Sequence, residues 1–217
     1  FVGKNARVKY YSIENWSKNT YNLNTKRALV DADGRIEWVS GNMGSGTTML
    51  YPCSILRGEG ASANSLGVAV AGPSQHQDIG AKTFHVAPRT KSVTRSRSIS
   101  FGGGIATFRG IARVGRKAKQ SDTTVACDAL LLDDHSSANT YPSLEINTND
   151  VTASHEAKTG KINAEVLFYL TSRGLTEEKA VQLVVNGFVE PIIKALPIEY
   201  ALELQRLIEM ELAGAIG

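Results

Sequence analysis

The sequence predicts a mainly β protein that ends in a helical segment. From Arg7 to about Val151 the chain consists of short runs of about 4–8 residues, in which many β-branched or aromatic residues alternate with polar ones. Gly, Asn, Asp, Pro or Ser separate these runs, and no gap has room for a helix. Further along, the apolar residues follow helical spacing as far as Gly217. We therefore expect a β core over residues 1–160 and a helical domain over residues 161–217.

Regular short strands are typical of a sandwich, a barrel or a solenoid. Short polar corners join several of the runs, whereas hairpins favour Asn-Gly or Asp-Gly turns, for which Asp33-Gly34 is the one good candidate. Small residues recur inside two runs, at Ser65, Gly67, Ala69, Ala71 and at Ser96, Ser98, Ser100. Both details favour stacked coils, although no repeat period is visible. The sequence pattern alone favours the solenoid but does not exclude the sandwich.

Capping residues and prolines divide the last part of the chain into three predicted helices. Asn163 caps the first helix, which Gly174 ends, and Thr176 caps the second. Pro191 is predicted to end the second helix, and Pro197 suits the first turn of the third. The apolar stripes comprise Val166, Leu167, Leu170; Val181, Val184, Val185, Phe188; and Ala201, Leu204, Ile208, Leu212. These stripes either pack on the β core or dock a partner.

Composition excludes several classes of protein. Hydrophobic residues make up 42% of the chain and charged residues 21%, which is typical of a folded globular protein. No apolar run approaches the roughly 18 residues that a membrane span requires, so we expect no membrane association. Cys53 and Cys127 show no zinc-site spacing and fit a reducing, cytoplasmic location. Because the first residue is Phe1, we expect a β core truncated on its N-terminal side.

A basic block suggests two rival functions. Between residues 82 and 119 there is no Asp or Glu, which is a feature of nucleic-acid-binding surfaces. The cations of this block are Lys82, Arg89, Lys91, Arg95, Arg97, Arg109, Arg113, Arg116, Lys117 and Lys119. Aromatic residues are sparse here and the net charge is only +3, so a solvated face is the preferred interpretation and nucleic acid an unlikely partner. A glycan-active β-helix enzyme would need clustered carboxylates, for which Asp133, Asp134 and Glu145 are the candidates.

The chain contains several long, distinctive segments, among them "TKRALVDADGRIEWVSGNMGSGTTMLYPCSILRGEG", "ACDALLLDD", "HEAKTGKI" and "FVEPIIKALPIEYALELQRLIEMELAGAIG". These segments resemble the SufB/SufD family, the scaffold proteins of the SUF system for iron–sulfur cluster assembly. The similarity runs from Asn5 to Gly217, and it implies a SufB-like chain that corresponds to the C-terminal half of a family member. It also implies a right-handed parallel β-helix followed by a small helical domain, which selects the solenoid.

The resemblance implies a site near the end of the β-helix. The His and Glu of the family's "HEA" motif match His155 and Glu156, which are the expected ligands of a transient iron–sulfur cluster and its iron. Adjacent strand residues point to opposite faces, so both would bind one iron only where the strand bends. The family's assembly cysteine aligns with Ser136, which cannot carry a persulfide. His135 is the adjacent alternative ligand, and Cys127 is the remaining thiolate candidate.

The resemblance also implies a non-enzymatic scaffold with two protein partners. A SufC-like ABC ATPase would dock on the C-terminal helices, with Phe188 as a candidate contact residue. A second SufB- or SufD-like subunit, or a second copy of this chain, would pair through the last coils, around Leu130 to Thr152. The chain has no nucleotide-binding motif of its own, which fits an ATPase supplied by another subunit.

Overall fold

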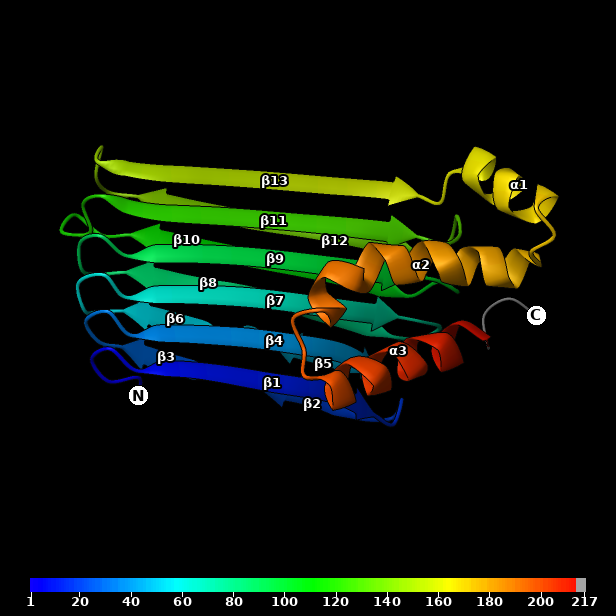
Figure 1. Cartoon of the computed structure of the whole chain (residues 1–217), viewed down its shortest axis with the longest axis horizontal. Helices are drawn as coiled ribbons and strands as arrows, with labels where there is room; N and C mark the ends of the chain where they lie inside the picture. Colours follow the sequence, from blue (N-terminus) through cyan, green and yellow to red (C-terminus); the bar gives the residue numbers. More distant parts are fainter. Residues whose placement is uncertain (214–217) are drawn as a thin grey trace.

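The computed structural model describes residues 1–213 and shows a parallel β-solenoid of about five turns followed by three helices (Figure 1). The predicted solenoid is therefore confirmed, and the sandwich is excluded because every pair of named strands is parallel. The last strand ends at Lys161 and the first helix begins at Ala164. Residues 214–217 of the predicted helical domain lie outside the described part of the chain.

Two parallel sheets form the walls of the solenoid, and the chain alternates between them. The six-stranded sheet contains β1 (Arg7–Trp16), β4 (Arg35–Gly44), β7 (Ser62–Ala71), β9 (Lys91–Ser100), β11 (Ser121–Leu131) and β13 (Val151–Lys161). The second sheet contains β2 (Tyr21–Asn24), β3 (Arg27–Val30), β5 (Thr47–Leu50), β6 (Cys53–Leu56), β8 (His76–His85), β10 (Ile105–Val114) and β12 (Ser137–Ile146). Each strand lies directly above the strand of the preceding turn in the same sheet.

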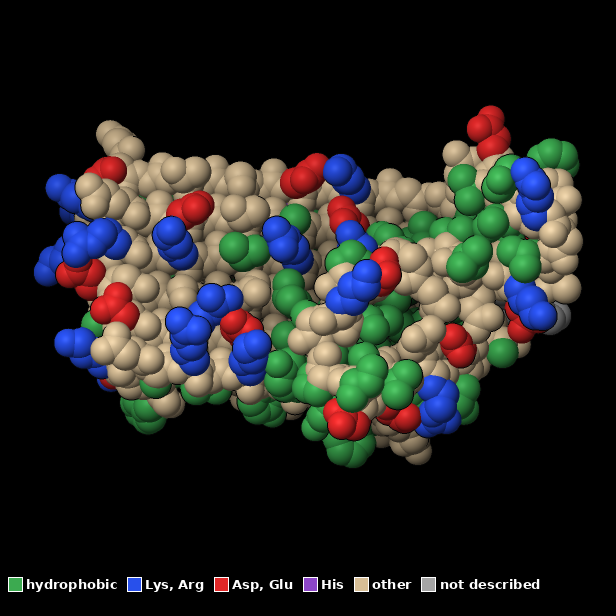
Figure 2. Space-filling view, in the orientation of Figure 1, with side chains coloured by type: hydrophobic (Ala, Val, Ile, Leu, Met, Phe, Trp, Pro, Cys, Tyr) green, Lys and Arg blue, Asp and Glu red, His purple; other side chains and the backbone are tan. Residues whose placement is uncertain are grey.

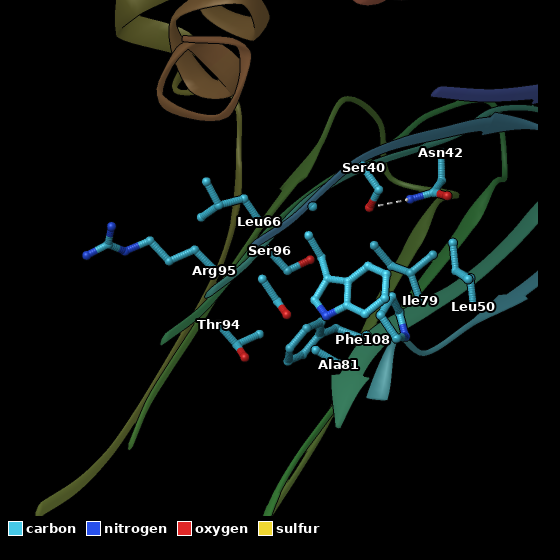
Figure 3. A pocket seen from close by; sticks show the side chains of 15 residues that line it. Ser40, Asn42, Leu50, Leu66, Ile79, Ala81, Thr94, Arg95, Ser96 and Phe108 are labelled. Carbon is cyan, nitrogen blue, oxygen red and sulfur yellow. Dashed lines mark hydrogen bonds between the residues drawn. The ribbon is translucent and has the colours of Figure 1, made fainter. Parts of the chain in front are cut away.

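The small residues found in the sequence line the interior of the solenoid. Gly67 pairs with Ser96 and Ala69 with Ser98, so their short side chains stack in register between the two sheets. Larger side chains from the seven-stranded sheet, among them Leu50, Ile79 and Phe108, point into the same space (Figure 3). The interior is thus filled by a mixture of apolar and hydroxyl side chains.

The corners between strands differ from the hairpin expected at Asp33-Gly34. This dipeptide lies between β3 and β4, which belong to opposite sheets, so the hairpin prediction is wrong. Asp33 takes the left-handed backbone conformation that a tight solenoid corner needs, with φ of 54°. The turns also differ in length, since Arg35 pairs with Ser62 but Lys91 pairs with Asp122. This unequal spacing explains why no period is visible in the sequence.

The helices are α1 (Ala164–Ser172), α2 (Glu177–Ile193) and α3 (Ile198–Ala213). The side chains of Asn163 and Thr176 accept hydrogen bonds from main-chain N–H groups in the first turns of α1 and α2, which confirms both predicted caps. Pro191 does not end α2, which continues to Ile193. Pro191 thus lies in the last turn of α2, only two residues before the helix ends, so its missing N–H removes a single helical hydrogen bond near the C-terminus.

Helices α2 and α3 cover the outer face of the six-stranded sheet near the C-terminal ends of its strands (Figure 1). One apolar core joins them to the sheet; it contains Val39, Met43, Val68, Val70, Ile99, Val181, Val185, Leu204 and Ile208. Figure 2 shows apolar side chains gathered around the helices, and Lys and Arg side chains over the uncovered part of that sheet. None of the helices within residues 1–213 is long and apolar enough to cross a membrane.

Candidate functional site

The candidate site lies at the end of the solenoid formed by β12 and β13. Each of these strands is the last in its sheet, so each has an unpaired backbone edge. Alternation along β12 directs Leu144 and Ile146 toward the interior, where no further turn covers them, and they are 38% and 42% exposed. This end of the solenoid is an incomplete apolar surface with two open strand edges.

His155 points into the solenoid from β13. It pairs in register with Val125, which is buried in the apolar cluster of Phe108, Ala112 and Cys127. Side chains at paired positions of parallel strands lie on the same face, so the imidazole stacks over Val125. The Nε2 atom of His155 is shielded from solvent and has no hydrogen-bond partner. A buried ring nitrogen without a partner is costly in a folded protein and is available as a ligand.

Cys127 lies one turn below, on the same inner face. Its Sγ is 3.9 Å from Thr140 Oγ1 and 3.8 Å from the main-chain oxygen of Glu156, the residue that follows His155. Burial raises the pKa of the Cys127 thiol, the nearby Asp128 carboxylate acts in the same direction, and the contact with Thr140 opposes them. The thiol is therefore protonated at neutral pH, and a metal ion would have to displace its proton.

Glu156 does not share this site. Its side chain is exposed on the opposite face of β13 and forms an ion pair with Lys158 at 2.7 Å. The hydrogen bond and charge of Lys158 lower the pKa of Glu156. β13 is one continuous strand whose pairing with β11 is unbroken at this point, so His155 and Glu156 diverge as alternation requires. The carboxylate is available to a partner on the outside of the solenoid.

His135 and Ser136 lie in the corner between β11 and β12. Ser136 is buried, donates to Asp133 at 3.0 Å and accepts from the N–H of Gly103 at 3.0 Å. Burial raises the pKa of Asp133, but hydrogen bonds from Ser136, Gly102 and His135 outweigh it and hold that pKa below its ordinary value. The hydroxyl of Ser136 is thus engaged in the corner, while the side chain of His135 is exposed.

Phe188 lies against the solenoid. The Arg97 guanidinium lies 5.1 Å from the centre of its ring, and the same arginine donates to the main-chain oxygen of Phe188. Arg97 also approaches Asp128 at 3.6 Å. These contacts fasten α2 to β9 and β11. The large apolar residues exposed on the helices are Val166, Phe168, Tyr169, Leu183, Ile198, Tyr200, Leu202 and Met210.

The carboxylates considered for glycan chemistry are dispersed. Asp133 is engaged in its corner, Asp134 pairs with Lys161, and Glu145 lies at the other end of β12, where it pairs with Arg113. Within residues 1–213, no three His, Cys, Asp or Glu side chains are grouped closely enough to hold a metal ion. His155 and Cys127, which lie on the same inner face, are thus the main candidate metal ligands at the solenoid end.

Sequence reasoning missed two residues near or inside the solenoid. Thr140 contacts Cys127, and no pattern in the sequence points to it specifically. His85 is fully buried. Its Nδ1 lies 2.8 Å from Thr90 Oγ1, and its Nε2 lies 2.8 Å from Ser92 Oγ. Its alternation with Thr83 in the sequence marks an inward position, but only the structure identifies hydroxyl partners across the interior.

The fold and the site together define a class of protein: a parallel β-solenoid with a free imidazole nitrogen and a buried thiol at its open end and helices on one outer face. Residues 1–188 match the family described as "SUF system FeS cluster assembly, SufBD core domain". The chain belongs to this family of iron–sulfur cluster assembly proteins.

Several named proteins are similar along the whole chain. An iron–sulfur cluster assembly SufBD family protein of Mycobacterium tuberculosis is 52% identical over 216 residues, which cover 100% of this chain and 26% of that protein. The corresponding protein of Staphylococcus saprophyticus is 50% identical over 216 residues, with 100% of this chain and 46% of that protein covered. The chain thus spans less than half the length of either relative.

Proposed function

We propose that this chain is a non-enzymatic, cytoplasmic scaffold on which an iron–sulfur cluster is assembled and then passed on. The cluster is cargo, held for a time at the open end of the solenoid. The observation that carries the proposal is the unpartnered, solvent-shielded Nε2 of His155 on the face where Cys127 is also buried. Imidazole and thiolate are both ordinary ligands of iron.

The cluster would be completed by a second subunit. His155 and Cys127 supply two donors, which leaves coordination positions of the iron ions for other ligands. The unpaired edges of β12 and β13, together with exposed Leu144 and Ile146, form a surface that a similar solenoid end would cover. We propose either a second copy of this chain or a related subunit as the occupant. Glu156 and His135 flank that surface as further candidate ligands.

An ABC-type ATPase is the second proposed partner, with the helices as its docking surface. The shared core of α2, α3 and the sheet leaves α1 without any buried residue, and its Phe168 is 75% exposed. A large apolar side chain with this much exposed surface is typical of a contact with another protein. Phe188 is a weaker candidate than Phe168 because Arg97 already covers its ring.

Sedimentation and reconstitution test the proposal together. The purified protein, alone and mixed with its ATPase and a related subunit, is incubated anaerobically with iron and sulfide. Association through the solenoid end, together with the charge-transfer absorption of a bound cluster, is expected. Replacing Leu144 with Asp should reduce both, because a carboxylate at that surface opposes burial. A cluster that forms equally well on this variant, without association, contradicts the shared-site proposal.

A further inference from the structure

In the described part of the chain, four of the ten cations in the basic block between residues 82 and 119 form ion pairs with carboxylates from other segments. Arg109 binds Asp78 at 2.9 Å and Arg113 binds Glu145 at 3.1 Å. Other members of the block pair with Glu59 and with Asp128. Within residues 1–213, however, Arg116 and Lys117 have no carboxylate within ion-pair distance. The block therefore leaves a local excess of positive charge.

Arg116 and Lys117 occupy the middle of the corner that follows β10. This corner is closed by a hydrogen bond from the N–H of Ala118 to the oxygen of Gly115, at 2.9 Å. It is tied to the neighbouring turn by a bond from the Gly115 N–H to the oxygen of His85, also at 2.9 Å. Two adjacent cations are thus held on a short, fixed corner.

The two cations border a groove with an apolar floor. The groove has a volume of about 650 Å³ and is lined by Ile55, Phe84, Val86, Arg113, Arg116 and Lys117, among others. Register aligns Ile55 with Phe84 and Phe84 with Arg113, so these side chains share the outer face of the seven-stranded sheet. Val86 is 49% exposed and the ring of Phe84 is half-buried. The imidazole of His85 points the other way, toward Thr90 and Ser92.

The charge on the two sides of the groove is unequal. Glu145 accepts from Arg113 and, at 3.2 Å, from the side-chain amide of Asn147, so that side is close to neutral. The side formed by Arg116 and Lys117 remains positive. A ligand that fits this arrangement has an anionic group at one end and a flat apolar group at the other. The volume lies within the roughly 300–1,000 Å³ of small-molecule sites.

We propose that this groove binds a nucleoside diphosphate or a closely similar phosphorylated ring compound. The phosphates pair with Arg116 and Lys117, and the ring lies on Phe84 and Val86. The groove lies on the outer face of the seven-stranded sheet, at the C-terminal ends of β8 and β10. His155, by contrast, points into the solenoid from β13. The groove is therefore a site separate from His155, and Asn147 at its border directly follows β12, a strand with an open edge.

Fluorescence titration of the purified protein with N-methylanthraniloyl ADP tests this proposal, with ADP, adenosine and inorganic pyrophosphate as competitors. ADP should compete at a concentration about tenfold lower than either of its parts, since both halves of the groove contribute. The double variant Arg116→Ala with Lys117→Ala should weaken binding about tenfold or more. The matched variant Lys91→Ala with Arg95→Ala removes two unpaired cations from the other sheet and should leave binding unchanged.

Three outcomes would overturn the proposal. They are equal competition by pyrophosphate and ADP, equal losses in the two double variants, and much tighter binding of a single-stranded oligonucleotide than of ADP. The first would indicate an anion surface only, and the third a nucleic-acid surface. Phe84→Ala separates the two halves of the groove: it should weaken ADP binding and leave pyrophosphate binding unaltered, with folding checked by circular dichroism.

Discussion

The sulfur of Cys127 lies 3.8 Å from the main-chain oxygen of Glu156, and Glu156 itself points away from the solenoid interior. The thiol therefore belongs to the inner face that it shares with His155, whereas the adjacent carboxylate belongs to the outer face. The two residues of the His-Glu pair thus serve different surfaces of the same strand. His155 is available to a ligand inside the solenoid, and Glu156 is available to a partner on its outer face.

Replacing Cys127 with Ser should lower the yield of reconstituted cluster, because a hydroxyl is a poor ligand for iron. Cys53 provides the matched control, since it is also buried and burial also raises its pKa, but it lies on β6 of the other sheet. Both substitutions should cost about 1–3 kcal/mol of unfolding free energy. Cluster yield is measured by absorption and stability by urea denaturation. Equal cluster yields from the two variants would indicate that Cys127 only packs in the interior and does not bind the cluster.

Replacing Phe168 with Asp should weaken capture of the ATPase about tenfold or more, as expected for an apolar contact residue at an interface. Stability should change by no more than about 0.5 kcal/mol, because α1 has no buried residue. Phe188→Ala is the contrasting variant: it should cost on the order of 2 kcal/mol of unfolding free energy through lost packing against the core shared by the helices and the sheet. Binding is measured by titration calorimetry. Unchanged affinity for Phe168→Asp would remove α1 from the docking surface.

Replacing Gly41 with Ala should loosen the packing of α3 on β4. A methyl group there would lie 2.6 Å from Cδ1 of the fully buried Leu204, so that side chain or the helix must shift, at a cost of about 1–3 kcal/mol. At Gly67 the added methyl meets Ser40 Oγ at an ordinary 3.5 Å, and the same substitution should be close to neutral. Thermal unfolding compares the two variants. A Gly41→Ala protein as stable as the Gly67→Ala protein would contradict the described helix–sheet contact.

Stability should decline in mild acid because of His85. Burial lowers the pKa of His85 to about 4, with Asp122 acting weakly in the opposite direction. The unfolded chain binds this proton at about pH 6.5, so the stabilisation is complete above that pH and is lost as pH falls toward 4, by up to about 3 kcal/mol. Urea denaturation from pH 7.5 to 4.5 should show this slope. It should flatten in His85→Gln and persist in a control with exposed His135 replaced by Gln.

The sequence predicts the helices better than the corners of the solenoid. Asn163 and Thr176 act locally, through a side chain that accepts from the next turn, so their caps were predictable. The prediction for Pro191 was wrong by two residues, because a proline near the C-terminus of a helix removes only one hydrogen bond and the last turn can still form. The corner at Asp33-Gly34 has the composition of a hairpin turn, and only the pairing of distant strands distinguishes the two.

The candidate site depends on register between strands about one turn apart, which local patterns do not contain. Alternation alone correctly predicts that His155 and Glu156 diverge. That His155 stacks on Val125, close to Cys127, follows from the pairing of β11 with β13. The engagement of Ser136 with Asp133 and Gly103 likewise needs the folded corner.

The central claim is that His155 is a cluster ligand at the solenoid end. The most direct measurement is anaerobic reconstitution of His155→Ala, in complex with its assembly partners, followed by absorption and iron analysis. His76→Ala is the matched control, since that imidazole bonds Thr107 at 3.0 Å on the seven-stranded sheet. We predict a several-fold loss of bound cluster for His155→Ala, no loss for His76→Ala, and unchanged thermal stability for His155→Ala. A His155→Ala complex that binds as much cluster as the unmodified protein would contradict the assignment.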